Sequence, residues 1–191
     1  MSDNKNDPIV NWDLSSLYNS LEDKQIDTDI QKCVEMMKRF YAFKGQLAYQ
    51  LPEALALMCD IDKLHNKLGV YGYLMFSTQV DNPKAVQLMG RVEERLSSAG
   101  AEYMNYFDHE IVAMPADVYQ KLLTESDIVK HHKSMLDSIR DAAQYLLPEE
   151  VEQSLAMRAP YGAGEWDEFC DEMEADLDIK IEGKSHTLTE A

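Results

Sequence analysis

The stretch LMCDIDKLHNKLGVYGYLMFSTQVDNPKAVQLMGRVEERLSSAGAEYMNY (residues 57–106) decides the fold. Its apolar residues recur at alternating steps of four and three on both sides of Asn82 and Pro83, as in α-helices that pack like coiled coils. Asn82 is a favourable N-cap, and proline suits the first helical position that follows it. The stretch therefore predicts two long helices that fold back on each other in an antiparallel hairpin. The apolar positions are Leu57, Ile61, Leu64, Leu68, Tyr71 and Met75, then Ala85, Met89, Val92, Leu96, Ala99, Tyr103 and Tyr106.

Further helices are predicted on either side of this hairpin. A lead-in over residues 11–18 precedes a helix from about Asp27 to Phe43, which ends before Gly45. Its buried face is Ile30, Cys33, Met37 and Phe40 or Tyr41. Pro52 opens the hairpin and Pro115 ends it. Beyond Pro115 we expect short helices over residues 116–123 and 149–157, with one longer helix between them. The apolar stripe of that longer helix is Ile128, His132, Met135, Ile139, Ala142 and Leu146.

Glycines inside the hairpin and the last thirty residues add two expectations. Glycine costs up to about 1 kcal/mol in a helix relative to alanine, so close helix–helix approach is expected at Gly69, Gly72, Gly90 and Gly100. After a linker over residues 159–164, Trp166, Phe169, Cys170, Met173 and Leu177 form an apolar stripe on an acidic helix. Two short strands, one with Ile179 and Ile181 and one over residues 186–189, are predicted to pair around Gly183. The fold class is thus mainly α, a helical bundle that ends in a small β-hairpin.

Composition excludes several classes of function. The net charge is −17, and it is concentrated after residue 100, where 7 basic residues face 21 acidic ones. Nucleic acid and anionic membranes are therefore excluded as partners, because no basic stripe could neutralise phosphates. The sequence has no signal-peptide core and no apolar run that could cross a bilayer. Cys33, Cys59 and Cys170 are widely spaced, so we interpret them as buried thiols of a cytoplasmic protein.

No catalytic or metal site is predicted. His109-Glu110 begins the zinc-peptidase motif His-Glu-x-x-His, but Ala113 stands where the second histidine would be needed. His131 and His132 point about 100° apart on a helix, and His132 is interpreted as a core histidine. Asp62 and His65 form a single weak copy of a di-iron pattern that must occur twice. Eight acidic residues over 165–178 lack the calcium-loop spacing and are interpreted as a solvated helix face.

Several segments, in order, resemble the amino-terminal region of oligoendopeptidase F, a zinc metallopeptidase family related to thimet oligopeptidase. They are WDLSSLY (residues 12–18), YGYLMFSTQVDNPKAVQLMGRVEE (71–94), HHKSMLDSIRDAAQYLLPEEVEQSL (131–155) and WDEFCDEMEADLDIKIEGKSHTLTEA (166–191). The resemblance implies a mainly helical domain that forms one wall of a peptide channel, with the zinc-binding motif in a later part of the protein. No residue of this sequence matches the zinc ligands or is singled out as contacting substrate.

The resemblance also sets expectations for the whole chain. Residues 1–191 would be the amino-terminal domain of a longer cytoplasmic peptidase, with parts at residues 1–114, 115–158 and 164–191 and with the catalytic domain absent. The complete enzyme would use zinc to hydrolyse oligopeptides, while this chain would bind no zinc and be inactive alone. The hairpin over residues 178–189 would lack the partner that should cover it and would leave an apolar patch at Ile179, Ile181 and Leu188, through which the chain could dimerise. The alternative is a free-standing acidic helical module that binds another protein.

Overall fold

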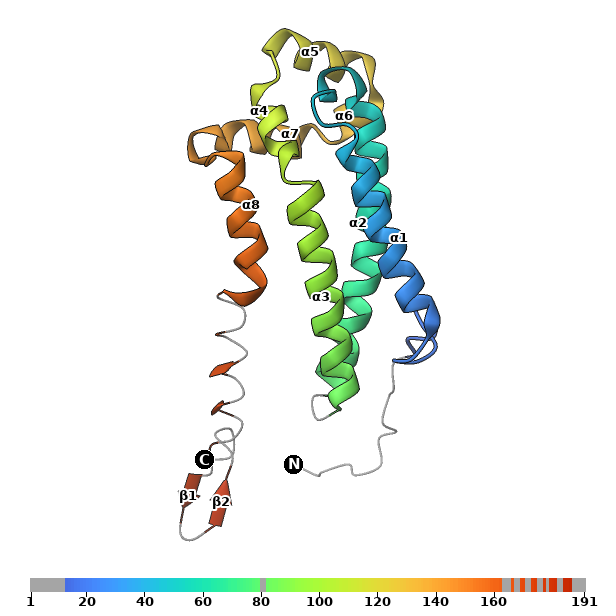
Figure 1. Ribbon diagram of the computed structural model, residues 1–191, viewed down its shortest axis with the longest axis vertical. Helices are drawn as coiled ribbons and strands as arrows, with labels where there is room; N and C mark the ends of the chain where they lie inside the picture. Colours follow the sequence, from blue (N-terminus) through green and yellow to red (C-terminus); the bar gives the residue numbers. More distant parts are fainter. Residues whose placement is uncertain are drawn as a thin grey trace, which may run out of the picture.

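The computed structural model describes residues 13–79 and 82–162 and, beyond them, residues 166, 169–170, 173–174, 177, 179–181 and 184–186. Within these residues the chain is mainly α-helical, as predicted (Figure 1). The helices are α1 (Lys24–Tyr41), α2 (Leu47–Thr78), α3 (Pro83–Tyr103), α4 (Tyr106–Ala113), α5 (Ala116–Glu125), α6 (Asp127–His131), α7 (Lys133–Asp141) and α8 (Glu149–Arg158). Two 3₁₀ turns, η1 (Ala142–Tyr145) and η2 (Ala159–Tyr161), follow α7 and α8. Two strands complete the described elements, β1 (Ile179–Ile181) and β2 (Lys184–His186).

The predicted helical hairpin is confirmed. Helices α2 and α3 lie side by side, and α1 packs against both, so that three long helices enclose the main core (Figure 1). Asn82 caps α3 as expected, because its side chain accepts a hydrogen bond from the backbone N–H of Lys84 at 3.1 Å and Pro83 follows it. Helices α4 to α7 gather at one end of this bundle, and α8 runs beside α3. The predicted buried face of α1 is confirmed at Ile30, Cys33, Met37 and Phe40, whereas Tyr41 is exposed.

The first helix of the hairpin begins earlier than Pro52. Helix α2 starts at Leu47 and is kinked at Gln50, which has φ −125° and ψ 23°. Proline lacks an N–H and its ring crowds the preceding turn, so a kink shortly before Pro52 is its expected effect. Pro52 therefore lies in the first turn after the kink, and the regular part of α2 begins close to where it was predicted.

The second helix of the hairpin ends earlier than predicted. The apolar stripe continues to Tyr106, but α3 stops at Tyr103 and α4 starts at Tyr106. Two tertiary hydrogen bonds hold the break: the Asn105 side chain donates to the carbonyl of Glu149 at 3.1 Å, and the Tyr106 hydroxyl donates to the carbonyl of Phe40 at 2.6 Å. The change of direction places the Tyr106 ring in the core against α1.

The single long helix predicted over residues 128–146 is wrong. It is divided into α6, α7 and η1, with a break at His132, whose ψ of 8° is not helical. As a result, Val129 and Leu136 are the fully buried residues, and the predicted stripe around them is only partly buried or exposed. The Arg140 side chain fixes the second segment by donating to the carbonyls of Ile111 and Met114 at 2.6 and 2.9 Å. These carbonyls belong to the end of α4, so the break depends on packing that a local sequence pattern does not contain.

Close packing of α2 against α3 accounts for one of the four glycines in the helical hairpin. A Cβ atom on Gly72 would lie 3.7 Å from the Cα of Met89, so α2 and α3 do approach closely there. Gly69, Gly90 and Gly100 have no atom within 4 Å of such a Cβ, so the expected close approach is wrong for these three. Gly45 serves another purpose, because its φ of 79° allows the sharp turn between α1 and α2.

Two glycine substitutions should therefore change stability in opposite directions. Gly45→Ala should lower the free energy of unfolding by about 1 kcal/mol, because a Cβ is strained at positive φ. Gly90→Ala should raise it by about 0.5–1 kcal/mol, because the position is helical and open. Urea unfolding followed by far-UV circular dichroism measures both changes. Equal effects of the two substitutions would contradict the turn geometry at Gly45.

Beyond α8 the described positions agree with the predicted acidic helix and with the first of the two predicted strands. Residues 159–161, part of the predicted linker, form the 3₁₀ turn η2. Trp166, Phe169, Cys170 and Met173 have helical backbone geometry. Strands β1 and β2 then pair antiparallel, with Ile179 opposite His186 and Ile181 opposite Lys184. The second strand was predicted over residues 186–189 but is observed over Lys184–His186, and residues 182–183 and 187–189 lie outside what the structure describes. Ile179 is partly buried, while Trp12, Leu188 and the side chain of Ile181 lie outside what the structure describes.

Candidate functional site

In the part of the chain that the structure describes, none of the metal sites considered from the sequence is completed by the fold. Across the described ranges, no three His, Cys, Asp or Glu side chains come close enough to hold an ion. His109 lies on α4 with Ala113 one turn later, and its Nε2 atom is buried without a hydrogen-bond partner in the described structure. Asp62 and His65 are both exposed on α2, and no third ligand joins them among the described residues. The His131 and His132 rings lie edge to face, with centroids 5.1 Å apart.

The described helices also include none that could cross a membrane. The longest of them, α2, carries charged side chains at Glu53, Asp60, Asp62, Lys63 and Lys67.

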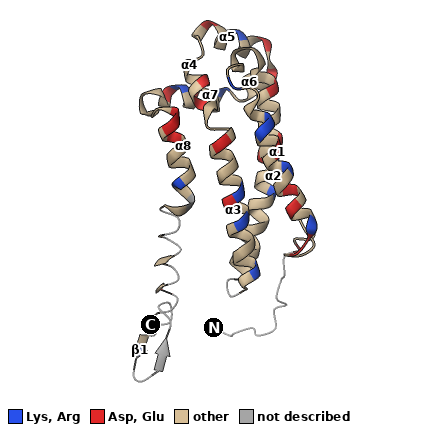
Figure 2. Ribbon diagram, in the orientation of Figure 1, with Lys and Arg blue, Asp and Glu red and all other residues tan. Residues whose placement is uncertain are grey.

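An open groove of about 690 Å³ runs between α1 and α2. Its lining combines three apolar residues with four basic and two acidic ones, a positive excess on a chain of net charge −17. Figure 2 shows basic and acidic residues along the ribbons of α1 and α2. The lining residues are Lys32, Glu35, Met36, Arg39, Leu57, Asp60, Lys63, Leu64 and Lys67. Two of the four basic side chains form ion pairs, Lys63 with Asp60 and Lys67 with Asp29, each with an N–O distance of 3.0 Å. The groove can therefore offer both apolar contact and positive charge to an extended chain that bears carboxylates.

A buried carboxylate, Asp29, pairs with Lys67 of this groove and connects the segment before α1, α1 itself and α2. It accepts hydrogen bonds from the hydroxyl of Tyr18 at 2.8 Å, the amide of Gln25 at 2.7 Å and the ammonium of Lys67 at 3.0 Å. Burial alone would raise the pKa of Asp29, but these three hydrogen bonds and the charge of Lys67 hold it below the usual value of 3.8. The Lys67 ammonium also lies 4.1 Å from the centre of the Tyr18 ring, a cation–π distance.

The three cysteines do not share one environment, which corrects the prediction that all are buried. Cys33 is fully buried in the core, Cys59 is half-buried and Cys170 is exposed. Burial and the charge of Asp62 raise the pKa of the Cys33 thiol to about 11. Cys59 lies on α2 with its Sγ atom 3.4 Å from Nε2 of His132. Sequence reasoning missed this contact because its partners are 73 residues apart and no local motif links them.

His132 is a satisfied, half-buried histidine, which agrees with its interpretation as part of the core. Its Nδ1 atom lies 2.9 Å from the carbonyl oxygen of Ile128, and its Nε2 atom contacts Cys59. Partial desolvation by the surrounding protein raises the pKa of Asp62 although its surface is largely exposed, and the charges of His65 and His132 act in the opposite direction. His132 and Asp62 are thus close enough to interact electrostatically.

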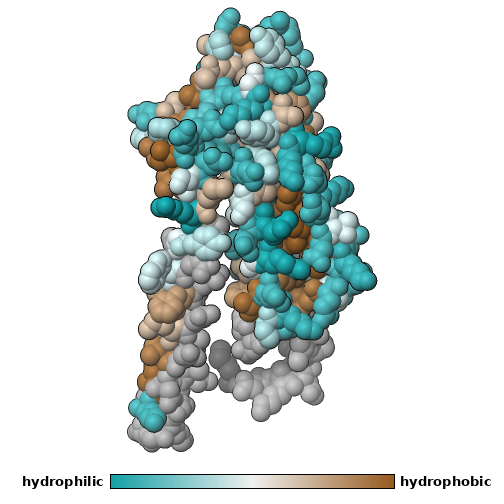
Figure 3. Space-filling view, in the orientation of Figure 1, coloured by the Kyte–Doolittle hydropathy of each residue, from teal (hydrophilic) through white to brown (hydrophobic). Residues whose placement is uncertain are grey.

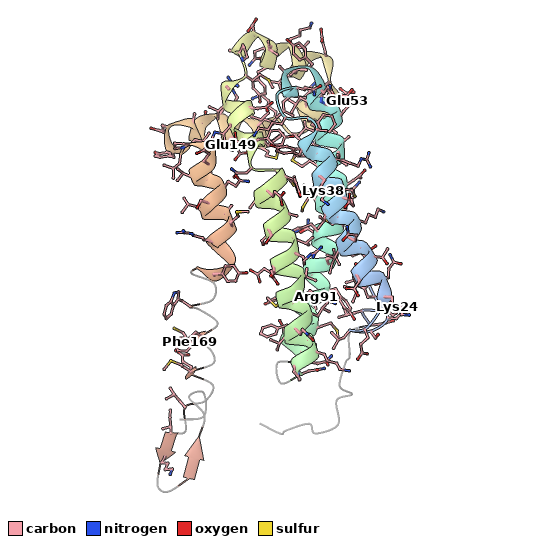
Figure 4. The ribbon with its side chains drawn as sticks, in the orientation of Figure 1. Lys24, Lys38, Glu53, Arg91, Glu149 and Phe169 are labelled. Carbon is pink, nitrogen blue, oxygen red and sulfur yellow. The ribbon has the colours of Figure 1, made fainter. Side chains whose placement is uncertain are left out.

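The acidic stretch after α8 carries an exposed apolar face. Trp166 is 67% exposed, and Phe169, Met173 and Leu177 are each about half exposed. The Trp166 and Phe169 rings contact each other edge to face with centroids 6.0 Å apart. Figure 3 shows this apolar surface, and Figure 4 marks Phe169 within it. The predicted stripe is therefore present, and the described residues do not cover it.

Comparison with known proteins gives one result. Residues 110–179 match a family model described as Oligopeptidase F, a little over a third of the chain. No curated protein and no solved structure matches. The matched segment runs from Glu110 on α4, through α5 to α8 and the exposed apolar face, to Ile179 of β1. Residues 110–179 are therefore similar to the amino-terminal region of the oligopeptidase F family.

Proposed function

We propose that this chain is the amino-terminal, channel-wall domain of a cytoplasmic zinc metalloendopeptidase that hydrolyses oligopeptides. The observation that carries the proposal is the family match over residues 110–179, which covers the elements that gather at one end of the bundle and the acidic stretch after them. A wall built of long helices would admit extended peptides and exclude folded proteins. The groove between α1 and α2 supplies a surface of mixed apolar and basic character for such a peptide.

Zinc belongs, in this proposal, to another part of the complete protein. The described residues provide no set of three ligands, so they do not fit a zinc site and we assign no step of hydrolysis to them. In the complete enzyme zinc would supply an activated water, and this domain would contribute by orienting and selecting peptides. The same reasoning leaves the 191-residue chain inactive by itself.

The complete protein and the 191-residue chain should be assayed side by side. We expect the protein from its natural source to be much heavier than 21.9 kDa, to contain zinc and to cleave a quenched oligopeptide, with chelator abolishing cleavage and zinc restoring it. The complete protein should leave uncut a folded protein that contains the sequence of this oligopeptide. The isolated 191-residue chain should cleave neither the oligopeptide nor the folded protein. A native mass near 21.9 kDa without zinc and without cleavage would refute the proposal.

A second candidate function is favoured by the exposed apolar face. Trp166, Phe169, Met173 and Leu177 are exposed apolar side chains, and aromatic residues and methionine are enriched in surfaces that bind other proteins. Under this alternative the chain is a free-standing interaction module. The native polypeptide would then have the mass of the 191-residue chain and would be isolated bound to another protein. In either case dimerisation through this terminal edge is a further proposal, which analytical ultracentrifugation of the isolated chain tests directly.

A further inference from the structure

The contact between Cys59 and His132 has a defined direction. A backbone carbonyl can only accept a hydrogen bond, so the Nδ1 atom of His132, 2.9 Å from the oxygen of Ile128, carries the proton. In the neutral imidazole the lone pair is then on Nε2, which lies 3.4 Å from the Sγ atom of Cys59. The thiol therefore donates to the imidazole. A nucleophile in contact with a base that a third group orients is the arrangement on which covalent catalysis depends.

The surroundings favour this pair as a reactive group. Cys59 lies on the long helix α2, and His132 lies at the break between α6 and α7, so both backbones are held by packed elements. Both residues are half-buried, which restricts their rotamers and still admits a small reagent. Asp62, one turn along α2, interacts with His132 and would stabilise the imidazolium that forms when the thiol loses its proton. Other titratable groups nearby are His65, His131 and Lys63, the last of which interacts with Cys59.

We propose that Cys59 is a nucleophilic thiol site, that His132 is its base, and that its co-reactant is a small disulfide. The Cys59 proton passes to Nε2 of His132, and the thiolate attacks one sulfur of the disulfide. A new sulfur–sulfur bond forms at Cys59 while the bond within the reagent breaks. The departing thiolate takes the proton from His132, so the products are a mixed disulfide and one free thiol, without any further oxidant. The proposal does not depend on peptidase activity.

The chain contains two internal reference thiols for a first test. The 191-residue chain is treated with oxidised glutathione at neutral pH, and modification of each cysteine is followed by peptide mass spectrometry. Access alone would make the half-buried Cys59 slower than the exposed Cys170. We expect the opposite, with Cys59 reacting about tenfold faster than Cys170 and the buried Cys33 remaining unmodified. A rate at Cys59 equal to or below that at Cys170 would overturn the proposal.

A matched pair of variants then isolates the base. His132→Asn keeps a donor where Nδ1 meets the carbonyl of Ile128 but removes Nε2, so the rate at Cys59 should fall about tenfold. His131→Asn changes the adjacent, exposed histidine and should leave the rate unchanged. The rate at Cys170 should stay the same in both variants, and protection of Cys33 reports that each is folded. An unchanged rate in His132→Asn, or equal losses in the two variants, would refute a role for His132; if that variant does not fold, the comparison of Cys59 with Cys170 decides alone.

Discussion

Replacing Phe40 with alanine should lower the free energy of unfolding by about 3–5 kcal/mol. The Phe40 side chain is fully buried, and its ring lies 5.7 Å, centre to centre, from both Tyr106 and Phe107. It therefore joins α1 to α4 at the place where the bundle meets the smaller helices. Truncation removes the transfer free energy of the ring and leaves a cavity that surrounding helices cannot fill. The change is measured by urea unfolding, with far-UV circular dichroism as the readout.

The matched control for Phe40 is an exposed aromatic residue. Tyr49 on α2 is 85% exposed, so Tyr49→Ala should change the free energy of unfolding by less than about 0.5 kcal/mol. The hydrogen bond from Tyr106 goes to the backbone carbonyl of Phe40 and is available in the variant, so the loss reports on packing. A loss below about 1 kcal/mol for Phe40→Ala would mean that α1 and α4 do not pack as described.

Replacing Asp29 with alanine should lower the free energy of unfolding by about 2–3 kcal/mol at neutral pH. The substitution leaves the donors on Tyr18, Gln25 and Lys67 without their shared acceptor. The Lys67 side chain is 32% exposed and can turn toward water, so the loss should be smaller than for a fully buried ion pair. Unfolding in urea at pH 7 measures this deficit.

The loss of unfolding free energy caused by Asp29→Ala should change with pH in one direction. The pKa of Asp29 is lower in the folded chain than its usual 3.8, so the folded state binds this proton less readily than the unfolded state. Its contribution to stability is therefore complete above that usual value and is lost as the pH falls through the folded value. The difference between wild type and Asp29→Ala should be largest at neutral pH and shrink as the pH falls below about 4. A difference that grows in acid would contradict the assigned network.

A surface copy of the same arrangement provides the control for Asp29. Asp137 accepts a hydrogen bond from the Tyr119 hydroxyl at 2.7 Å and pairs with Lys133, and hydrogen bonds from these two groups lower its pKa. Its side chain is 37% exposed, so water can replace both partners. Asp137→Ala should therefore destabilise the chain much less than Asp29→Ala, although each carboxylate accepts from a tyrosine hydroxyl and a lysine ammonium.

The amino-acid sequence was sufficient to predict the structure wherever that structure depends on residues close together along the chain. The turn of Asn82 and Pro83 and the buried face of α1 agree with prediction, because caps and helical periodicity act within a few residues. The breaks after Tyr103 and at His132 could not be predicted in this way. In both places the apolar spacing continues through the break, and the break is held by distant partners such as the carbonyl of Glu149.

The candidate sites illustrate the same division. The incomplete zinc motif at His109 could be rejected from the sequence, because the missing ligand is one helical turn away at Ala113. The acceptor role of Asp29 toward Lys67, 38 residues later, and the contact of Cys59 with His132 depend on how α2 packs against its neighbours. The spacing of residues along the chain does not predict these long-range contacts, so they become visible only in the folded structure.

The tight turn between α2 and α3 also bears on how the chain acquires its shape. The two helices are consecutive and meet across a short connection, so bringing them together costs little loop-closure entropy. Contacts between segments close in sequence form fastest, and α1, which precedes α2 after the Gly45 turn, adds to the same unit. The three helices can thus assemble during synthesis, while the ribosome is still adding α4 and the segments beyond it. Each later helix would then leave the ribosome after the surface against which it packs has formed.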